Sequence, residues 1–445
     1  MFVVIVGLGE VGTHIAQLLS NYKGYEVVGI DIDSNKLEKF RETCDIKTIN
    51  GYGASLPVLK DAEVSNAQFV ISVSSSEEVN IISALVSKQL GAKNTIARVS
   101  SPFYLENENV KEYEALGIDI LLSPERRTAL KIFQSIENPF FIKVDSLGGG
   151  RVFINQLMVD EKSGFADKTI EDLKLNTNIL IVGIDRDNDF LFPSGSFLVK
   201  NGDTLFMAAR RQVMERIDLF LPMKSHSVDR IILLGASKIN YFLAKIAQDQ
   251  YRVLLIEPDS EKSGKIAPLL DKTAFYNDDL FSSELLDELL LSENDFFVVA
   301  TESDETNLLL SVLLNDRGLS KIACVTHKSK LSTTIKKAGI HQIFSPQSII
   351  ASDIASILRT QELISLESFK NAKAEFVELI VHPDSVVVGK TIDNSPIPEK
   401  TIFVAIIRSK EVLIPRGDTL LEKNDTVIVL CLEQELEKIE ELLRS

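Results

Sequence analysis

The chain opens with Phe2-Val3-Val4-Ile5-Val6-Gly7-Leu8-Gly9-Glu10-Val11-Gly12, an apolar run followed at once by a Gly-x-Gly-x-x-Gly turn. A helix-like pattern comes next, and this strand–turn–helix context is typical of dinucleotide-binding folds. Gly7 permits the tight turn, Gly9 lets the backbone approach a pyrophosphate, and Gly12 allows the helix to pack closely on the strand. The free N–H groups and the partial positive charge at the start of the helix favour a phosphate there.

An acidic residue completes the nucleotide-binding pattern. Asp31 ends the second predicted strand, at the distance beyond the turn that the dinucleotide fingerprint requires. Its carboxylate is placed to accept hydrogen bonds from ribose hydroxyls, which disfavours a 2′-phosphate and therefore favours NAD over NADP. The alternative is a glycine turn that only packs, with Asp31 as a helix cap.

Further candidate ligand contacts lie where the next strands end, because open α/β sheets bind ligands outside the carboxyl ends of their strands. Ser74 to Glu78 also fit an ordinary helix N-terminus. Arg98 follows a strand that should be buried, so it needs an anionic partner, either a phosphate or an acid such as Glu78. The candidates of this group are Gly51, Val73, Ser74 and Arg98.

The chain repeats itself once, because its second half contains the features of its first half in the same order. The recurring features are Gly7 and Gly235, Asn80 and Asn307, Ser123-Pro124 and Ser345-Pro346, Lys168-Thr169-Ile170 and Lys390-Thr391-Ile392, and the segments 184–209 and 406–431. The intervals between the paired features are nearly constant. Repetition at a fixed period indicates duplicated structural units, so two copies are predicted to fill the chain.

Each copy has two parts that differ in their predicted secondary-structure pattern. The first part alternates short strands with helices, which predicts a parallel sheet covered on both faces. In copy one, strands are expected at 2–6, 27–31, 46–50, 69–73 and 95–99, and helices at 11–21, 34–43, 55–62 and 77–90. The second part has short strands, turn residues and one short helix near 169–173, a small α+β module. The predicted domains are 1–137, 138–222, 228–365 and 372–445, with a polar linker at about 365–374.

The second nucleotide turn is degraded. It reads Gly235-Ala236-Ser237-Lys238-Ile239-Asn240, so the second and third glycines are lost, although Glu257 still ends the following strand. Cys324 is aligned with Arg98, which removes the cation as well. Both the close approach of backbone to phosphate and the close packing of the helix are therefore impaired. Reduced or altered binding is favoured over a purely structural second copy.

Composition restricts the class of protein. The 445 residues suggest about three domains or four small ones. A net charge of −16 (48 − 64) argues against nucleic acid or an anionic lipid surface as the main partner. No apolar run approaches the ~20 residues that span a bilayer, no signal peptide is recognised, and three scattered cysteines fit a reducing compartment. A soluble cytosolic protein is expected.

Catalytic and metal-binding patterns are not found. The five histidines show no paired spacing, no Cys/His/Asp cluster has metal-ligand spacing, and a dehydrogenase needs a proton donor beside its nicotinamide. Tyr241 and Lys245 make a Tyr-x-x-x-Lys, but they fall in the helix that follows the degraded turn, the wrong place for catalysis. The sequence predicts a binding protein built twice, with no catalytic and no metal-ligating residues.

A family resemblance follows from these motifs. The glycine turn, Asp31, Gly51-Tyr52-Gly53-Ala54-Ser55, the run closing on Asn80 and Ile96-Ala97-Arg98 resemble an RCK N-terminal (KTN) domain. The modules at 140–221 and 374–445, each with Lys-Thr-Ile and a Pro…Asp near its end, resemble the RCK C-terminal (TrkA-C) domain. Two such pairs in tandem are similar to the TrkA family, the cytosolic regulatory subunits of bacterial Trk potassium-uptake systems.

The resemblance implies a function and partners. It implies a peripheral protein that assembles, as a tetrameric ring, on the inner face of the membrane against a potassium-translocating subunit, with NAD(H), ATP and ADP competing for its sites. Carried over, the residues of the first turn (7–12) match the phosphate loop, Asp31 the ribose ligand, Val73 and Ser74 the flanking strand end, and Arg98 the basic contact. Tyr52 departs from the family, in which Asp is frequent there.

Two other functions remain open from the sequence. An NAD-dependent oxidoreductase would have to transfer hydride to a substrate. A regulatory subunit could instead sense another nucleotide, such as a cyclic dinucleotide, through its C-terminal modules.

Overall fold

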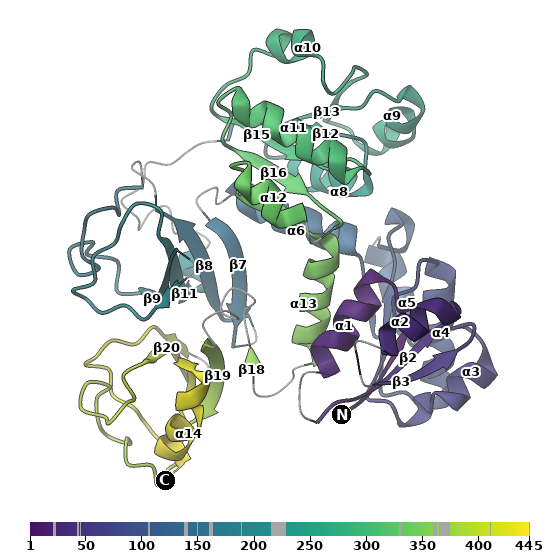
Figure 1. The fold of residues 1–445 in the computed structure, drawn as a ribbon. Coiled ribbons are helices and arrows are strands. Elements are labelled where there is room, and N and C mark those ends of the chain that lie inside the picture. The colour runs from purple at the N-terminus through teal and green to yellow at the C-terminus, as the bar shows by residue number, and fades with distance from the viewer. Residues whose placement is uncertain are drawn as a thin grey trace. The chain divides into compact units, whose positions relative to one another are not determined.

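The computed structural model describes residues 1–20, 24–41, 44, 46–105, 107–137, 141–148, 150–159, 163–187, 189–214, 228–328, 331–358, 363–364, 374–409 and 411–444. These form two compact units. Unit one consists of Met1–Phe133 and Val228–Leu358, and unit two of Gln134–Ser227 and Arg359–Ser445 (Figure 1). Of the predicted linker at 365–374, residues 365–373 lie outside the described residues. Residues 138–140 and 215–227, beside the other predicted boundaries, lie outside them as well.

The first half of unit one is a six-stranded parallel sheet in the order β3-β2-β1-β4-β5-β6. The order reverses between β1 and β4, and such a switch point opens the crevice in which doubly wound sheets bind ligands. The strands are β1 (Phe2–Val6), β2 (Glu26–Asp31), β3 (Lys47–Asn50), β4 (Phe69–Ser72), β5 (Asn94–Arg98) and β6 (Ile120–Leu122). The helices are α1 (Glu10–Ser20), α2 (Ser34–Arg41), α3 (Leu56–Asp61), α4 (Glu77–Leu90), α5 (Asn107–Leu116) and α6 (Pro124–Glu137).

The second half of unit one repeats this sheet in the order β14-β13-β12-β15-β16-β17. Its strands are β12 (Arg230–Leu234), β13 (Arg252–Ile256), β14 (Ala274–Tyr276), β15 (Asp295–Val299), β16 (Ile322–Val325) and β17 (Gln342–Phe344). Its helices are α8 (Lys238–Ala247), α9 (Ser260–Ile266), α10 (Ser283–Glu288), α11 (Asp304–Asp316), α12 (Leu331–Lys337) and α13 (Pro346–Leu358). Two Rossmann-like sheets are therefore present, as the βα rhythm predicted.

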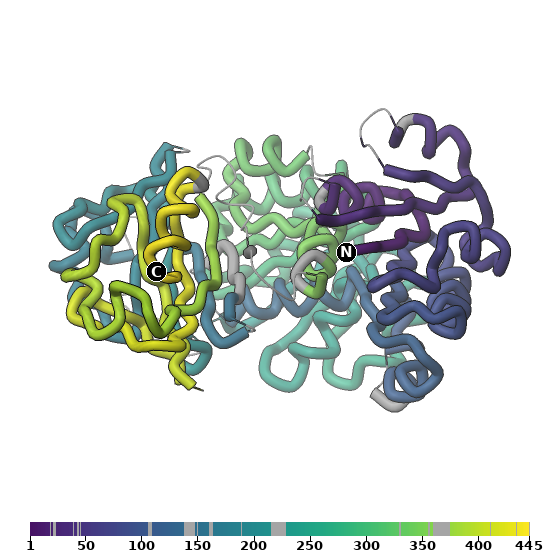
Figure 2. Tube along the Cα trace, turned by 90° about the horizontal axis from the view of Figure 1, so that it is seen from below, coloured from purple at the N-terminus to yellow at the C-terminus, as the bar shows by residue number. Residues whose placement is uncertain are grey.

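The last helix of each half of unit one packs on the other half. α13, the end of the second half, packs on α1 of the first half, as Figure 1 and Figure 2 show. The reciprocal helix α6 places Phe133 edge-on against Tyr251 of the second half, with ring centroids 6.1 Å apart. Arg127 on α6 also binds Asp353 on α13, with Nε 2.5 Å from the carboxylate. The residues of α13 buried in the first-half core are Ile350, Ala351, Ile354 and Leu358.

Unit two contains two five-stranded antiparallel sheets, in the orders β10-β9-β11-β8-β7 and β18-β19-β22-β20-β21. One cluster of buried residues from both sheets joins them into a common core. The strands are β7 (Phe141–Leu147), β8 (Val152–Met158), β9 (Ile179–Arg186), β10 (Asp189–Leu191), β11 (Thr204–Arg210), β18 (Leu363–Ile364), β19 (Ala374–Ile380), β20 (Thr401–Arg408), β21 (Glu411–Leu413) and β22 (Thr426–Leu432). The helices are α7 (Arg211–Met214) and α14 (Leu436–Arg444).

The short helix predicted near 169–173 is instead a series of hydrogen-bonded turns. The backbone of Thr169 pairs with Leu198 in an isolated β-bridge, and its hydroxyl accepts from the N–H of Asp172. Lys174 then adopts a left-handed conformation with φ +47°. A side chain that bonds nearby backbone competes with the helix, and a residue in the left-handed region ends it. The prediction of a helix there was wrong.

Two buried serines that differ in their hydrogen bonding give a stability test. Ser83 on α4 is fully buried and its hydroxyl has no partner among the described residues, whereas the equally buried Ser311 on α11 donates to the carbonyl of Asn307 at 2.7 Å. Ser83→Ala should therefore raise the free energy of unfolding by up to about 1 kcal/mol, because it removes an unsatisfied polar group, while the control Ser311→Ala should lower it by about 1 kcal/mol. Urea unfolding of both variants measures this. Equal effects in the two variants would contradict the difference in bonding.

Candidate functional site

The first glycine turn has the geometry of a phosphate-binding loop. Gly7 has φ +95° and donates its N–H to the carbonyl of Ile30 at 2.8 Å. A Cβ on Gly12 would lie 1.9 Å from the carbonyl oxygen of Gly7, so a side chain at that position is incompatible with this turn. A Cβ on Gly9 would meet nothing within 4 Å, so open space faces the start of α1. Because the first N–H groups of a helix have no intrahelical partner, this space suits an anion.

Asp31 anchors this turn from the end of β2. One carboxylate oxygen accepts the N–H of Leu8 at 2.8 Å, and the other accepts the N–H of Asp33 at 2.9 Å. The side chain is 9% exposed. Each carboxylate oxygen has a second lone pair, so Asp31 can hold the turn and still accept a hydrogen bond from a ribose hydroxyl.

The other candidates of the turn lie where the sequence predicted them. Leu8 is buried, and its side chain lies directly over Gly29 of β2. Glu10 is exposed in the first turn of α1, while Val11 is buried in the core. Gly51 follows β3 and donates its N–H to the carbonyl of Asp31 at 3.0 Å. These groups therefore surround the carboxyl ends of β1, β2 and β3.

Asn80 fixes the ends of β4 and β5. Its side-chain oxygen accepts from both the N–H and the hydroxyl of Ser74, each at 2.8 Å, and its amide donates to the carbonyls of Ser74 and Arg98. Val73 donates its N–H to the carbonyl of Val6 at 2.8 Å, which joins this loop to β1. Sequence reasoning missed this positioning function, although the recurrence of Asn80 as Asn307 was a signal for it.

The acidic partner of Arg98 is Glu125 and not Glu78, the acid suggested as an alternative to a phosphate. The guanidinium lies 3.9 Å from the carboxylate of Glu125 on α6, so the two groups form a loose ion pair. Glu78 accepts a hydrogen bond from the hydroxyl of Ser76. The prediction missed Glu125 because it lies on a later helix, which only the folded sheet brings close to Arg98. About a quarter of the Arg98 side chain (28%) is exposed, so the guanidinium is accessible to a ligand anion.

The second half retains the frame of this site. Gly235 has φ +96° and donates to the carbonyl of Ile256, and Glu257 accepts the N–H of Ala236 at 2.7 Å, as Asp31 does with Leu8. Asn307 repeats the bonds of Asn80, from Thr301 to the carbonyl of Val325. This last bond shows that Val325 is the equivalent of Arg98. The alignment with Cys324 was one residue out, although the cation is indeed absent from that position.

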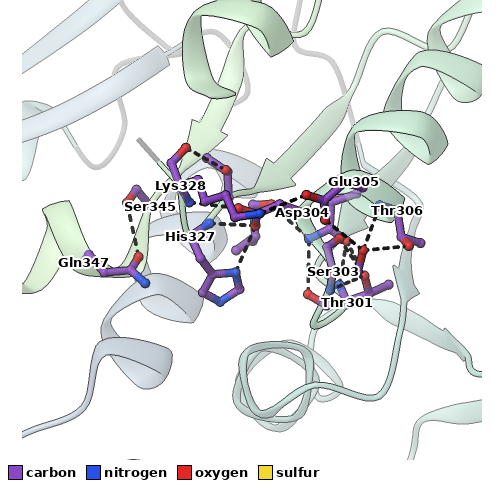
Figure 3. Close-up of polar contacts among 12 residues, drawn as sticks. Thr301, Ser303, Asp304, Glu305, Thr306, His327, Lys328, Ser345 and Gln347 are labelled. Carbon is purple, nitrogen blue, oxygen red and sulfur yellow. Dashed lines mark hydrogen bonds and ion pairs between the residues drawn. The ribbon is translucent and has the colours of Figure 1, made fainter. Parts of the chain in front are cut away.

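A polar cluster that the sequence did not predict lies at the carboxyl ends of β15 and β16 (Figure 3). Asp304 accepts the N–H groups of His327 and Lys328, both at 2.8 Å, and lies 3.1 Å from Nδ1 of His327. Burial acts to raise the pKa of Asp304, but these donors outweigh it and lower the pKa. The ion pair with Glu305 raises the pKa of Lys328, and the charges of Asp304 and of Glu10 from the first half add to this.

The histidines, cysteines and the Tyr241–Lys245 pair are placed as follows in the described part of the chain. No group of three or more His, Cys, Asp or Glu side chains there could hold a metal ion. The Tyr241 ring is 4% exposed, and Lys245 Nζ lies 3.4 Å from its hydroxyl within α8, so the pair is part of the helix packing. All three cysteines are buried and free. In the part of the chain that is described, no helix combines the length and hydropathy required to cross a bilayer.

Two parallel sheets of one strand order, each with a nucleotide-type turn and each followed by a small antiparallel module, define a duplicated Rossmann-like protein. The TrkA-N domain matches residues 3–124 and 231–346, and the TrkA-C domain matches residues 156–221 and 376–444. The chain belongs to the TrkA family of tandem RCK proteins.

Relatives and solved structures agree with this assignment. A "Trk system potassium uptake protein TrkA homolog" of Archaeoglobus fulgidus is 33% identical over 446 residues, covering all of both chains. The "Trk system potassium uptake protein TrkA" of Halomonas elongata is 27% identical over 98% of this chain and 96% of its own. The solved "GsuK channel bound to NAD" aligns with a TM-score of 0.63 at 16% identity, over 99% of this chain and 78% of that one, which shows the fold.

The polar cluster of Figure 3 predicts an acid-dependent contribution to stability. A carboxylate whose pKa is lower in the folded chain than in the unfolded chain stabilises the fold above the unfolded pKa, and this contribution disappears as the pH falls through the folded value. Asp304→Asn should therefore lower the free energy of unfolding by about 1–3 kcal/mol at pH 7, with the difference shrinking below about pH 4. Urea unfolding at both pH values tests this. The exposed neighbour provides a control, Glu305→Gln, which should change little; a pH-independent deficit for Asp304→Asn would contradict the prediction.

Proposed function

We propose that this chain is the regulatory subunit of a potassium-uptake system and binds NAD(H), or a competing adenine nucleotide (ATP or ADP), at its first glycine turn. The open space in front of Gly9, in the turn that Asp31 anchors through Leu8, is the observation that carries the proposal. Asp31 supplies a ribose acceptor, and its charge opposes a 2′-phosphate. Arg98, whose ion pair with Glu125 is loose, supplies a cation for a phosphate.

The partner is proposed from the relatives. Proteins that match this chain over its full length are named as Trk system potassium uptake proteins, and the aligned solved structure is a channel bound to NAD. We therefore propose a potassium-translocating membrane subunit as the partner. The chain would act from the cytoplasm, peripherally on the inner face of the membrane, as a homo-oligomer in the form of a tetrameric ring, and without catalysing a reaction of its own.

Regulation would then be a coupling between nucleotide binding and the arrangement of the chain. A ligand shifts a conformational equilibrium only by its differential affinity for the two states. The phosphate-binding start of α1 is continuous with the α1 face on which α13 packs, so a change in α1 is transmitted to the second half. A coupling of about 1–3 kcal/mol would change potassium flux several-fold to about a hundredfold.

Nucleotide binding is tested by calorimetric titration of the purified chain with NADH, NAD, ATP and ADP. Asp31→Ala removes the ribose acceptor and the anchor of Leu8, so affinity should fall about tenfold or more, the effect of losing one strong hydrogen bond. Glu257→Ala is the matched control, because it removes the equivalent anchor of Ala236 in the second half. Unchanged affinity in Asp31→Ala, with its melting temperature intact, would refute the assignment of this site.

Regulation is tested by potassium uptake in cells that contain the membrane subunit. Gly9→Asp places a carboxylate in the open space where the phosphate is expected, so it should abolish the response of uptake to nucleotide while the chain remains folded. The control is Gly150→Asp, a glycine of a turn in unit two that also has open space around it. Since Gly150 has φ +80°, thermal melting must show that this control is folded. A normal nucleotide response in Gly9→Asp would contradict regulation through this turn.

A further inference from the structure

We infer that the second nucleotide fold is closed by its own side chains, so that each chain binds one dinucleotide and not two. This inference rests on the nucleotide binding proposed for the first half. It concerns three places at the carboxyl edge of the second sheet: the turn after β12, the first N–H groups of α8, and the loops on either side of the turn.

Asn240 stands at the position of Gly12 and places a side chain against the turn. It is fully buried, and its side-chain amide donates to the carbonyls of Gly235 at 2.7 Å and Leu234 at 3.1 Å. A side chain at Gly12 would clash with the carbonyl of Gly7, so a side chain is accommodated in the second half only if the helix and the turn move apart. Asn240 therefore wedges α8 away from the strand whose close packing positions a pyrophosphate.

Ser237 takes up a hydrogen-bond donor that a phosphate would use. It stands at the position of Gly9, and its hydroxyl accepts the N–H of Asn240 as the N-cap of α8. Gly9 has no side chain that could cap α1, and a Cβ on it would meet nothing within 4 Å. Lys238 brings a positive charge to the same helix start, so an anion is still attracted, but a capping group already occupies the place.

An ion pair lies between the segments on either side of the second turn. Lys262 after β13 forms an ion pair with Glu302 after β15 at 3.3 Å, across the switch point. The equivalent positions of the first half hold Lys36 and Ser75, which cannot form such a pair. Both paired side chains are largely exposed, so the pair is weak and matters through its position.

One carboxylate beside the second turn has no counterpart in the first half. Asn50 and Asn277 make the same bond, to the backbone carbonyls of Asp31 and Glu257, which fixes the register between the two halves. In this register Asp278 replaces the uncharged Gly51, whereas Asp279 stands at the position of Tyr52, where Asp is frequent in the family. The negative charge of Asp278 at that edge opposes a pyrophosphate. The residues of the second half thus do not fit the ligand proposed for the first.

The number of sites per chain tests the inference. Titration of the full chain with NADH in a calorimeter should give one site per chain. Asp31→Ala should weaken that site about tenfold or more, and Glu257→Ala should leave both affinity and stoichiometry unchanged. Two sites in the unaltered chain, or a loss of stoichiometry in Glu257→Ala, would overturn the inference while leaving the proposed function intact. Zero sites for NADH, NAD, ATP and ADP alike would overturn both.

Exchanging the turn residues gives an independent test. The double variant Ser237→Gly with Asn240→Gly should open the second turn and raise the stoichiometry towards two. The reciprocal variant, Gly9→Ser with Gly12→Asn, should remove the single site. Thermal melting of both double variants shows whether they are folded. If the opened variant folds and still gives one site while the reciprocal variant retains full affinity, the turn residues do not decide binding and the inference fails.

Discussion

The packing of α13 on α1 is the contact on which the rest of unit one depends. The core of the first sheet is completed by side chains that come from the far end of the second half, a place very distant from α1 along the chain. Burial of these apolar side chains removes area from water in a place that neither half covers alone. The start of α1 is also where a phosphate would bind. One helix thus faces the proposed ligand with its N-terminus and the other half of the chain with its side.

The two halves share their frame and differ in what a ligand would meet. Each sheet end is held by a buried asparagine, each turn by a carboxylate, and each small module by one arginine–aspartate pair, Arg186 with Asp203 and Arg408 with Asp425. These groups satisfy buried backbone and charge, so their loss would be costly whatever the ligand. At the ligand-facing positions glycine has become serine or asparagine. Folding and ligand binding therefore impose separate constraints on this chain, and only the folding constraint is visible in both halves.

Local patterns were sufficient to predict the sheets. The strands of the first half lie close to the predicted ranges, because short apolar runs alternating with helical patterns depend on neighbours in sequence. The glycine turn and Asp31 were predicted for the same reason. The exchange of α6 and α13, and with it the pairing of Arg98 with Glu125, depends on tertiary contacts that no local pattern encodes. Cys324 was aligned with Arg98 one residue out, although the interval of 227 between Asn80 and Asn307 leads from Arg98 to Val325, and the bond from Asn307 to the carbonyl of Val325 fixes this register.

The asymmetry between the halves has a consequence for regulation. If both nucleotide folds bound the same ligand with equal affinity, binding would act on the packing of α6 and α13 from both halves. One ligand could then stabilise either arrangement of the two halves. With one open turn, as proposed, ligand free energy would enter through α1 alone, and the second half would serve as a fixed support for α6. A ligand shifts a conformational equilibrium by its differential affinity for the two states. A single site, coupled to α13 through α1, would therefore shift the equilibrium in one direction only. The side chains that close the second turn would then contribute to the sign of regulation as well as to the number of sites.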